Sequence, residues 1–256
     1  MESHKTKGAR SKRKVALVTG GARRLGRHIA LGLAREEYDV VITYRNSAKD
    51  AQRTLSELKA LGSKAIALRA EVSKRADVNR ILAQVEKKYA RLDVLVGNAG
   101  VFPPATPFDE ITEKLFDDTI SSNLKGNFLF AQAASRLMKR NARGGSIVIM
   151  ASLGAFQIWK DTLSYNVSKA GVVALTRAMA RALAPQGISV NAIAPGYIEM
   201  QDEPGAMSGS SVDRVPMKRN GTPEDIVRAV LFFTQSASYI TGEILKVDGG
   251  KHLLAV

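Results

Sequence analysis

Short apolar runs alternate with longer amphipathic stretches along nearly the whole chain. The short runs are rich in β-branched residues and predict strands at 15–19, 39–44, 64–69, 92–96, 147–150, 189–193 and 244–247. The longer stretches predict helices at 26–35, 47–61, 75–89, 113–140, 163–184 and 223–234. Ser47 is expected to cap the second helix, which Gly62 should end. In the longest helix Phe116, Ile120, Leu124 and Phe128 recur every four residues and share a face.

This order of elements predicts an α/β fold made of one domain. Strands that are apolar throughout are buried on both sides, which is typical of a parallel sheet between helices. We therefore expect a single-domain, doubly wound parallel sheet of the Rossmann type, with helices on both faces and ligands at the carboxyl ends of the strands.

No linker divides the chain, so residues 14–256 are expected to form the domain and residues 1–13 a disordered basic arm. The Gly- and Ser-containing stretch near 200–215 is expected to be a mobile loop. It could close over a substrate, and a plain surface excursion is the alternative.

Composition narrows the classes of protein that remain. Of 256 residues, 45% are hydrophobic and 24% charged, as in ordinary globular proteins. No apolar run approaches the roughly 20 residues of a membrane span, and the basic N-terminus lacks a secretory signal, so a cytoplasmic location is expected. The absence of cysteine excludes disulfides and thiolate catalysis, and the three histidines lack ligand spacing, so no metal site is expected.

The formal net charge of +14 leaves two interpretations open. The first fourteen residues hold six Lys and Arg against one Glu, and the remainder is still basic. An anionic partner, such as a phosphorylated cofactor or an acidic carrier protein, would explain this charge, and so would a solvated surface. Aromatic residues do not interleave with the basic ones, so nucleic acid is not expected as a partner.

A glycine-rich turn follows the first predicted strand and points to a dinucleotide. Glycines at 20 and 26 would let the backbone approach a pyrophosphate at the start of the first helix. No carboxylate follows the second strand, where one would accept hydrogen bonds from a ribose 2′-hydroxyl. Groups that could bind a 2′-phosphate stand there and in the turn, which favours NADPH: Arg23, Arg24, Arg45 and Ser47.

Tyr165 and Lys169 are four residues apart on a predicted helix and therefore share a face. Such a pair alone is more often an exposed helix pair than a site. Ser152 strengthens the functional interpretation because it ends an apolar strand, where open α/β sheets place their ligand groups.

With these features the sequence resembles the short-chain dehydrogenase/reductase family from about residue 14 to 250. The matching residues are the turn at 19–26, Asn98-Ala99-Gly100, Asn123, Ser152, Tyr165 thirteen positions later, Lys169, Pro195-Gly196 and Val247-Asp248-Gly249-Gly250. The resemblance implies cofactor contacts at Gly20, Arg23, Arg24, Leu25, Gly26, Tyr44, Arg45, Asn46, Ser47, Glu71, Val72, Asn98, Ala99, Gly100, Tyr165, Lys169, Pro195, Gly196 and Ile198.

The resemblance also implies a catalytic group of four residues. Tyr165 would give a proton to the substrate oxygen, its pKa lowered by Lys169 and by the oxidised nicotinamide. Ser152 would hold that oxygen, and Lys169 would also bind the nicotinamide ribose. Asn123 would hold a water that supplies protons to Lys169. The cofactor would carry out the redox step.

Some residues depart from the usual family pattern. Arg24 replaces the middle glycine of the turn, and together with Arg45 and Ser47 it is similar to the pteridine reductases. Phe102 falls where those enzymes place an aromatic ring against the pterin, although they usually carry an aspartate where Ser152 stands. Phe102, Ser152 and Tyr165 are the expected substrate contacts.

Three functions follow from these residues. The leading one is NADPH-dependent reduction of a 3-oxoacyl thioester or related ketone, small or carrier-bound, as in 3-oxoacyl-[acyl-carrier-protein] reductases. The second is reduction of a dihydropteridine, and the third is a non-catalytic regulator that senses NADPH. The resemblance also implies a homotetramer packed through helices 113–140 and 163–184, although a role in the core of one subunit explains much of the same apolar pattern.

Overall fold

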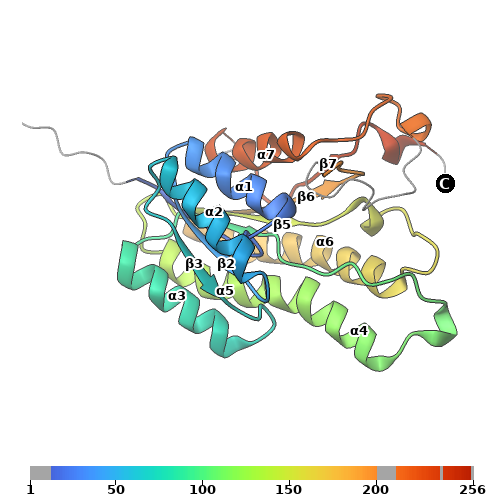
Figure 1. The fold of residues 1–256 in the computed structure, drawn as a ribbon, viewed down its shortest axis with the longest axis horizontal. Helices are drawn as coiled ribbons and strands as arrows, with labels where there is room; N and C mark the ends of the chain where they lie inside the picture. Colours follow the sequence, from blue (N-terminus) through green and yellow to red (C-terminus); the bar gives the residue numbers. More distant parts are fainter. Residues whose placement is uncertain (1–12, 201–211, 237–238, 255–256) are drawn as a thin grey trace, which may run out of the picture.

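The computed structural model describes residues 13–200, 212–236 and 239–254 (Figure 1). The predictions for the basic arm and for most of the loop near 200–215 therefore lie outside the described residues. Among the described helices, none combines the length and the apolar character that a membrane span requires.

The described strands form one parallel sheet of seven, in the order β3-β2-β1-β4-β5-β6-β7. The strands are β1 (Val15–Val18), β2 (Asp39–Tyr44), β3 (Ile66–Arg69), β4 (Val94–Gly97), β5 (Gly145–Met150), β6 (Ile188–Pro195) and β7 (Ile244–Val247). The order reverses direction between β1 and β4, which opens a crevice at the carboxyl ends of these strands. The predicted doubly wound α/β fold is confirmed.

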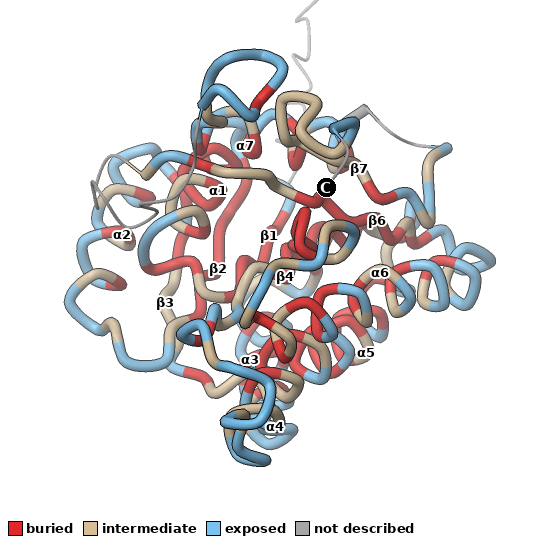
Figure 2. Tube along the Cα trace, turned by 90° about the vertical axis from the view of Figure 1, so that its right-hand side faces the viewer, coloured by how far each residue is buried: buried red, intermediate tan, exposed pale blue. Residues whose placement is uncertain are grey.

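Helices cover both faces of the sheet (Figure 1). One layer holds α1 (Arg24–Arg35), α2 (Ala48–Ala60) and α7 (Pro223–Leu231), and the other holds α3 (Arg75–Tyr89), α5 (Gly126–Met138) and α6 (Leu163–Leu183). Side chains alternate along each strand, so Leu17 packs into the α3–α5–α6 layer while Ala16 and Val18 pack into the α1–α2–α7 layer. Figure 2 shows the buried strands between helices whose outer faces are exposed.

The long helix expected at 113–140 is interrupted. The structure has α4 (Glu113–Ile120), a π-helical turn at Ser121–Lys125 and then α5. Within the turn, the backbone carbonyl of Asn123 accepts a hydrogen bond of 2.7 Å from Asn127 Nδ2. Side-chain bonding of this kind competes with the regular helical ladder, and the wider turn re-aims the Asn123 side chain. The expected helix at 223–234 also ends early, in a π-helical turn at Phe232–Ser236.

The two ends of α2 compare differently with what the sequence predicts. Gly62 lies just past α2 with φ of +78°, as expected of a residue that ends a helix. Ser47 occupies the N-cap position of α2, but its side chain makes no capping hydrogen bond, so that prediction was wrong. Ser47 instead lines the cleft described below.

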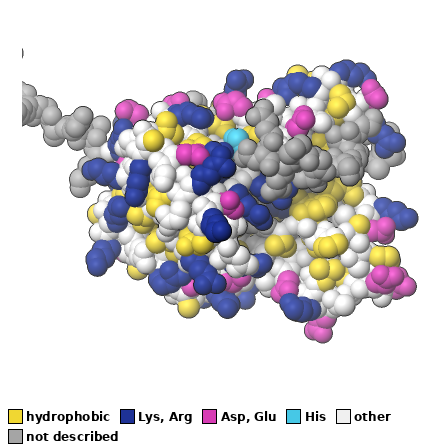
Figure 3. Space-filling model, in the orientation of Figure 1, with side chains coloured by type: hydrophobic (Ala, Val, Ile, Leu, Met, Phe, Trp, Pro, Cys, Tyr) yellow, Lys and Arg dark blue, Asp and Glu magenta, His cyan; other side chains and the backbone are white. Residues whose placement is uncertain are grey.

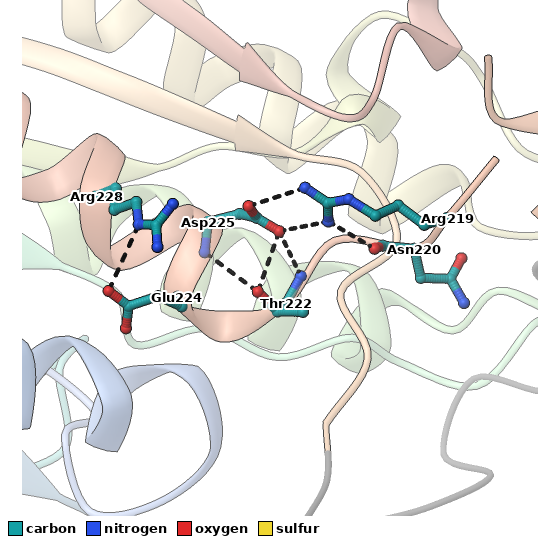
Figure 4. A network of polar contacts seen from close by, with 6 residues as sticks. All are labelled: Arg219, Asn220, Thr222, Glu224, Asp225 and Arg228. Atoms are coloured by element: carbon teal, nitrogen blue, oxygen red, sulfur yellow. Dashed lines mark hydrogen bonds and ion pairs between the residues drawn. The ribbon is translucent and has the colours of Figure 1, made fainter. Parts of the chain in front are cut away.

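The start of α7 is held by a network of polar side chains (Figure 4). Thr222 and Asp225 form a reciprocal capping box, and Arg219 donates to both Asp225 oxygens at 2.8 and 3.1 Å. These contacts hold the pKa of Asp225 well below its usual range. The adjacent Gly221 exchanges backbone hydrogen bonds with Tyr197 and Glu199, so the network fixes the chain that leaves β6.

Candidate active site

A cleft of about 720 Å³ opens at the carboxyl ends of the central strands. Every residue predicted to contact the cofactor lines it, from Gly20 after β1 to Ile198 after β6. The predicted substrate contacts Phe102, Ser152 and Tyr165 line it as well. Figure 3 shows Lys and Arg side chains beside a hollow on this face, with hydrophobic side chains near its far end.

The turn between β1 and α1 has no space for larger residues at its critical positions. A Cβ atom on Gly26 would lie 2.3 Å from the Gly20 carbonyl oxygen, and Gly20 itself has φ of +64°. Asn98 Nδ2 donates to the Thr19 carbonyl at 2.9 Å, and Thr19 Oγ1 accepts from the amides of Asn98 and Ala99 at 3.0 Å each. These bonds hold the turns after β1 and β4 together as one floor beneath the N-terminus of α1.

Positive charge gathers at the β2 end of the cleft. Arg23, Arg24 and Arg45 line it together with Ser47. The guanidinium of Arg45 lies 3.2 Å from the carboxylate of Glu71, and its side chain remains more than half exposed. The sequence identified Arg45 and Glu71 separately as cofactor contacts, but no spacing rule indicates that they pair.

Ser152, Tyr165 and Lys169 meet in the middle of the cleft. Ser152 follows β5, accepts a hydrogen bond of 3.1 Å from the amide of Gly154 and is only 5% exposed. The Ser152 side chain acts on the Tyr165 hydroxyl as a hydrogen-bonding neighbour that lowers its pKa. Lys169 Nζ lies 5.7 Å from the centre of the Tyr165 ring and donates to the Met150 carbonyl at 2.7 Å. The two hydroxyls therefore form a paired hydrogen-bonding site with an ammonium beside it.

Burial sets the ionisation of this group. It raises the pKa of Tyr165, and the hydrogen bond to Ser152 opposes that shift. Burial lowers the pKa of Lys169 to about 8, because the ammonium loses water and gains no carboxylate partner among the residues that the structure describes. The expected lowering of the Tyr165 pKa involves the oxidised nicotinamide as well as Lys169, and it stays a prediction; in the protein alone, desolvation of the phenol outweighs the effect of Ser152.

Asn123 lies behind this group, outside the cleft lining. Its side chain is fully buried, with Oδ1 accepting from the Val101 amide at 2.7 Å. Its Nδ2 donates to the Val101 carbonyl and to Ser168 Oγ at 2.9 and 3.0 Å, and Ser168 donates to the Tyr165 carbonyl at 2.7 Å. Asn123 thus ties the chain after β4 to the helix that carries Tyr165. Its expected contact with a water stays a prediction.

The cleft also contains aromatic residues that sequence reasoning missed. Trp159 and Tyr197 line it beside Phe102 and Tyr165. They come from irregular segments before α6 and after β6, where neither periodicity nor a motif marks them. Their proximity depends on loop geometry, which only the structure supplies.

Comparisons with known proteins agree with this architecture. A family model described as Enoyl-(Acyl carrier protein) reductase matches residues 20–252. The 3-oxoacyl-[acyl-carrier-protein] reductase FabG of Staphylococcus epidermidis is 38% identical over 245 residues, covering 94% of this chain and 99% of that protein.

Solved structures agree as well. A putative short-chain alcohol dehydrogenase from Sinorhizobium meliloti 1021 superimposes with a TM-score of 0.88 at 33% identity, covering 94% of this chain and 97% of that one. A short chain dehydrogenase from Burkholderia cenocepacia J2315, in complex with NADP, gives 0.87 at 33% identity, covering 94% and 99%. The chain therefore belongs to the short-chain dehydrogenase/reductase family of oxidoreductases.

Proposed function

We propose that the protein is an NADPH-dependent carbonyl reductase in which Tyr165 acts as the general acid. The substrate is a 3-oxoacyl thioester or a related ketone. The observation that carries this proposal is the paired Ser152 and Tyr165 hydroxyls in the cleft, with the Lys169 ammonium beside them. A carbonyl oxygen held by both hydroxyls would gain its proton from Tyr165.

The residues of the cleft fit a phosphorylated dinucleotide. The crowding at Gly26 and the N-terminus of α1 suit a pyrophosphate against bare backbone. Arg45, Ser47 and the turn arginines suit a 2′-phosphate, because residues 45–47 after β2 hold no carboxylate and Arg45 pairs with the nearby Glu71 carboxylate. The NADP complex of the Burkholderia cenocepacia relative supports this choice. The dinucleotide would supply the hydride, and the protein binds, orients and moves the proton.

The ionisation of the group suits proton donation near neutral pH. Because its pKa is raised, Tyr165 keeps its proton until a negative charge develops on the substrate oxygen. Lys169, with a pKa of about 8, can pass a proton back to the phenolate and recover it near neutral pH. Ser152 fixes the direction from which the carbonyl oxygen approaches.

Reduction of a dihydropteridine is the second candidate, and Phe102 favours it. The Phe102 ring meets the Tyr165 ring edge-on at 4.6 Å between centroids, on the substrate side of the cleft. A non-catalytic regulator that only senses NADPH, the third function considered, needs no general acid. It therefore explains the paired Ser152 and Tyr165 hydroxyls least well.

Oxidation of NADPH, followed by its absorbance, separates these functions. Turnover with an acetoacetyl thioester or a simple ketone supports the leading proposal, and turnover confined to a dihydropteridine supports the second. Tight NADPH binding with no turnover of either would favour the sensor and contradict the reductase.

Replacing Arg45 with Ala is expected to weaken NADPH binding by about ten- to a hundredfold and to leave NADH binding almost unchanged. The variant loses a charge-assisted contact to the 2′-phosphate and exposes that phosphate to the Glu71 carboxylate. Titration calorimetry with both dinucleotides measures the two affinities. Arg53, which is exposed and lines only a neighbouring cavity, is the matched control as Arg53→Ala. Equal weakening of NADPH and NADH by Arg45→Ala would show that Arg45 does not read the phosphate.

We also propose that the protein is a homotetramer, as the family resemblance implies. Phe128 on α5 and Val167 on α6 are exposed apolar side chains that a partner subunit would cover. Sedimentation velocity should then give the mass of four chains, and a monomer at micromolar concentration would contradict the assembly.

A further inference from the structure

Four aromatic rings line the substrate side of the cleft: Phe102, Trp159, Tyr165 and Tyr197. We call this set the ring wall. Its members come from three separate parts of the chain, after β4, around the start of α6 and after β6. The leading proposal, reduction of a 3-oxoacyl thioester or related ketone, uses only the hydroxyl of Tyr165 and gives the other three rings no role.

The rings are arranged around Trp159. Its plane lies within 13° of the Tyr165 ring and 19° of the Tyr197 ring, at centroid distances of 6.2 and 6.3 Å. Phe102 stands across them, at 77° to Tyr165 and 64° to Trp159. The ring wall therefore has three planes that run nearly parallel and one ring that crosses them.

Several contacts hold the ring wall in place. The Trp159 carbonyl accepts from Thr162 Oγ1 at 3.0 Å and from the buried amide of Asn166 at 3.1 Å. The Lys251 ammonium lies 4.2 Å from the centre of the Tyr197 ring, a cation–π contact. Thr162 and Asn166 thus anchor the backbone at Trp159, and Lys251 packs against the Tyr197 ring, which reduces the cost of ordering these residues around a ligand.

The ring wall still has aromatic surface to offer. Phe102 is 58% exposed, and neither Trp159 nor Tyr165 is fully buried. Large exposed aromatic side chains around a cleft are typical of a binding site, because burying them is favourable only when a ligand or partner arrives. Here the rings adjoin the paired hydroxyls that would hold the carbonyl oxygen.

We propose that the substrate carries a flat conjugated ring directly attached to, or fused beside, the carbonyl that is reduced. This inference rests on the proposed function, because Tyr165 belongs both to the ring wall and to the reacting group. With the carbonyl oxygen at Ser152 and Tyr165, the adjoining part of the substrate meets Trp159 and Phe102. A flat ring gains face and edge contacts with these side chains that a saturated chain of equal size does not.

Two ketones of the same carbon skeleton test this inference: acetophenone and cyclohexyl methyl ketone. Conjugation makes the aryl ketone the less electrophilic of the two, so a preference for it must come from binding. We expect the wild-type enzyme to reduce acetophenone with a kcat/KM roughly tenfold higher, the upper end of what one added ring pair contributes. Trp159→Leu should bring the ratio close to one, and Trp159→Phe should keep part of the preference.

The matched control is Phe108→Leu. Phe108 is an exposed aromatic residue that follows Phe102 in the same segment and does not line the cleft. The Phe108→Leu variant should keep the wild-type ratio of kcat/KM for the two ketones. A wild-type enzyme that reduces both ketones equally well, or a Trp159→Leu variant that keeps the full preference, would overturn the ring-wall proposal while the reductase activity itself stands.

A binding measurement keeps the inference separate from the reductase proposal. Trp159 is the single tryptophan of the chain, so intrinsic tryptophan fluorescence reports on the ring wall. With wild-type protein saturated with NADP⁺, which permits no reduction, acetophenone should quench this fluorescence saturably and cyclohexyl methyl ketone should not. If neither these ketones nor an acetoacetyl thioester oxidises NADPH but the quenching is selective, the reductase proposal fails and the ring site stands. Equal quenching by both ketones, or none by either, overturns the ring site.

Discussion

Replacing Tyr165 with Phe is expected to lower kcat by about 10²- to 10⁴-fold while the affinity for NADPH stays within a few-fold of the wild type. The variant keeps the ring and its contacts with Phe102 and Trp159 and loses only the hydroxyl that would give up the proton. Ser152 would remain as a hydrogen-bond donor, so some activity should survive. Steady-state rates with a ketone, together with calorimetric titration of NADPH, measure the two quantities.

The control for this variant is Tyr89→Phe. Tyr89 ends α3, lies outside the cleft and donates its hydroxyl hydrogen to the Lys64 carbonyl. Its loss should leave kcat close to the wild-type value. Normal turnover by Tyr165→Phe would show that Tyr165 is not the general acid. An equal loss of kcat in Tyr89→Phe would mean that the effect reflects the stability of the protein.

Replacing Lys169 with Met is expected to lower kcat by about a hundredfold and yet to make the folded protein more stable at neutral pH. Burial lowers the pKa of Lys169 from 10.5 to about 8, so below pH 8 the folded protein bears the full cost of holding a desolvated ammonium. That shift corresponds to about 3 kcal/mol, against which the lost hydrogen bond to the Met150 carbonyl counts about 1 kcal/mol. The variant should therefore gain about 2 kcal/mol in the free energy of unfolding.

The stability difference between the wild type and Lys169→Met should change with pH, because folding is linked to the protonation of Lys169. Between pH 8 and 10.5 the unfolded chain binds the proton more strongly than the folded one, so wild-type stability rises relative to Lys169→Met. Urea unfolding of both proteins at a series of pH values should show the stability difference shrinking across this window. Lys139→Met, at an exposed site just after α5, should show no such trend. A difference that stays constant with pH would mean that Lys169 is not desolvated as the structure indicates.

Much of the fold could be predicted because the strands carry their own signal. Val40, Val41 and Ile42 are consecutive apolar residues whose side chains point alternately to the two faces of β2. Such a run is typical of a sheet that is covered by helices on both faces. The ends of the strands were predicted less accurately, because a strand's end depends on the strand that pairs with it. β6 runs to Pro195 because β7 pairs with it as far as Val247. The π-helical turn at Asn123 could not be predicted from periodicity, because the Asn123 side chain that it carries bonds to Val101, which lies 22 positions away.

Part of the candidate site could likewise be predicted from the sequence, and part could not. Glycines 20 and 26, Ser152, Tyr165 and Lys169 carry motif spacing that is visible in the sequence, and the structure brings them into one cleft. Pairings between distant segments carry no such spacing, which is why the Arg45–Glu71 ion pair and the ring wall were missed. Ionisation also escaped sequence reasoning, because the depth at which Tyr165 and Lys169 are buried decides their pKa values.

The most direct test of the account is a crystal structure of the protein with NADP⁺ and a bound ketone. We expect the ketone oxygen to lie within hydrogen-bonding distance of both the Tyr165 and the Ser152 hydroxyls, with Lys169 Nζ beside the same tyrosine. A ketone oxygen that contacts neither hydroxyl, in a complex that turns over when NADPH replaces NADP⁺, would contradict it.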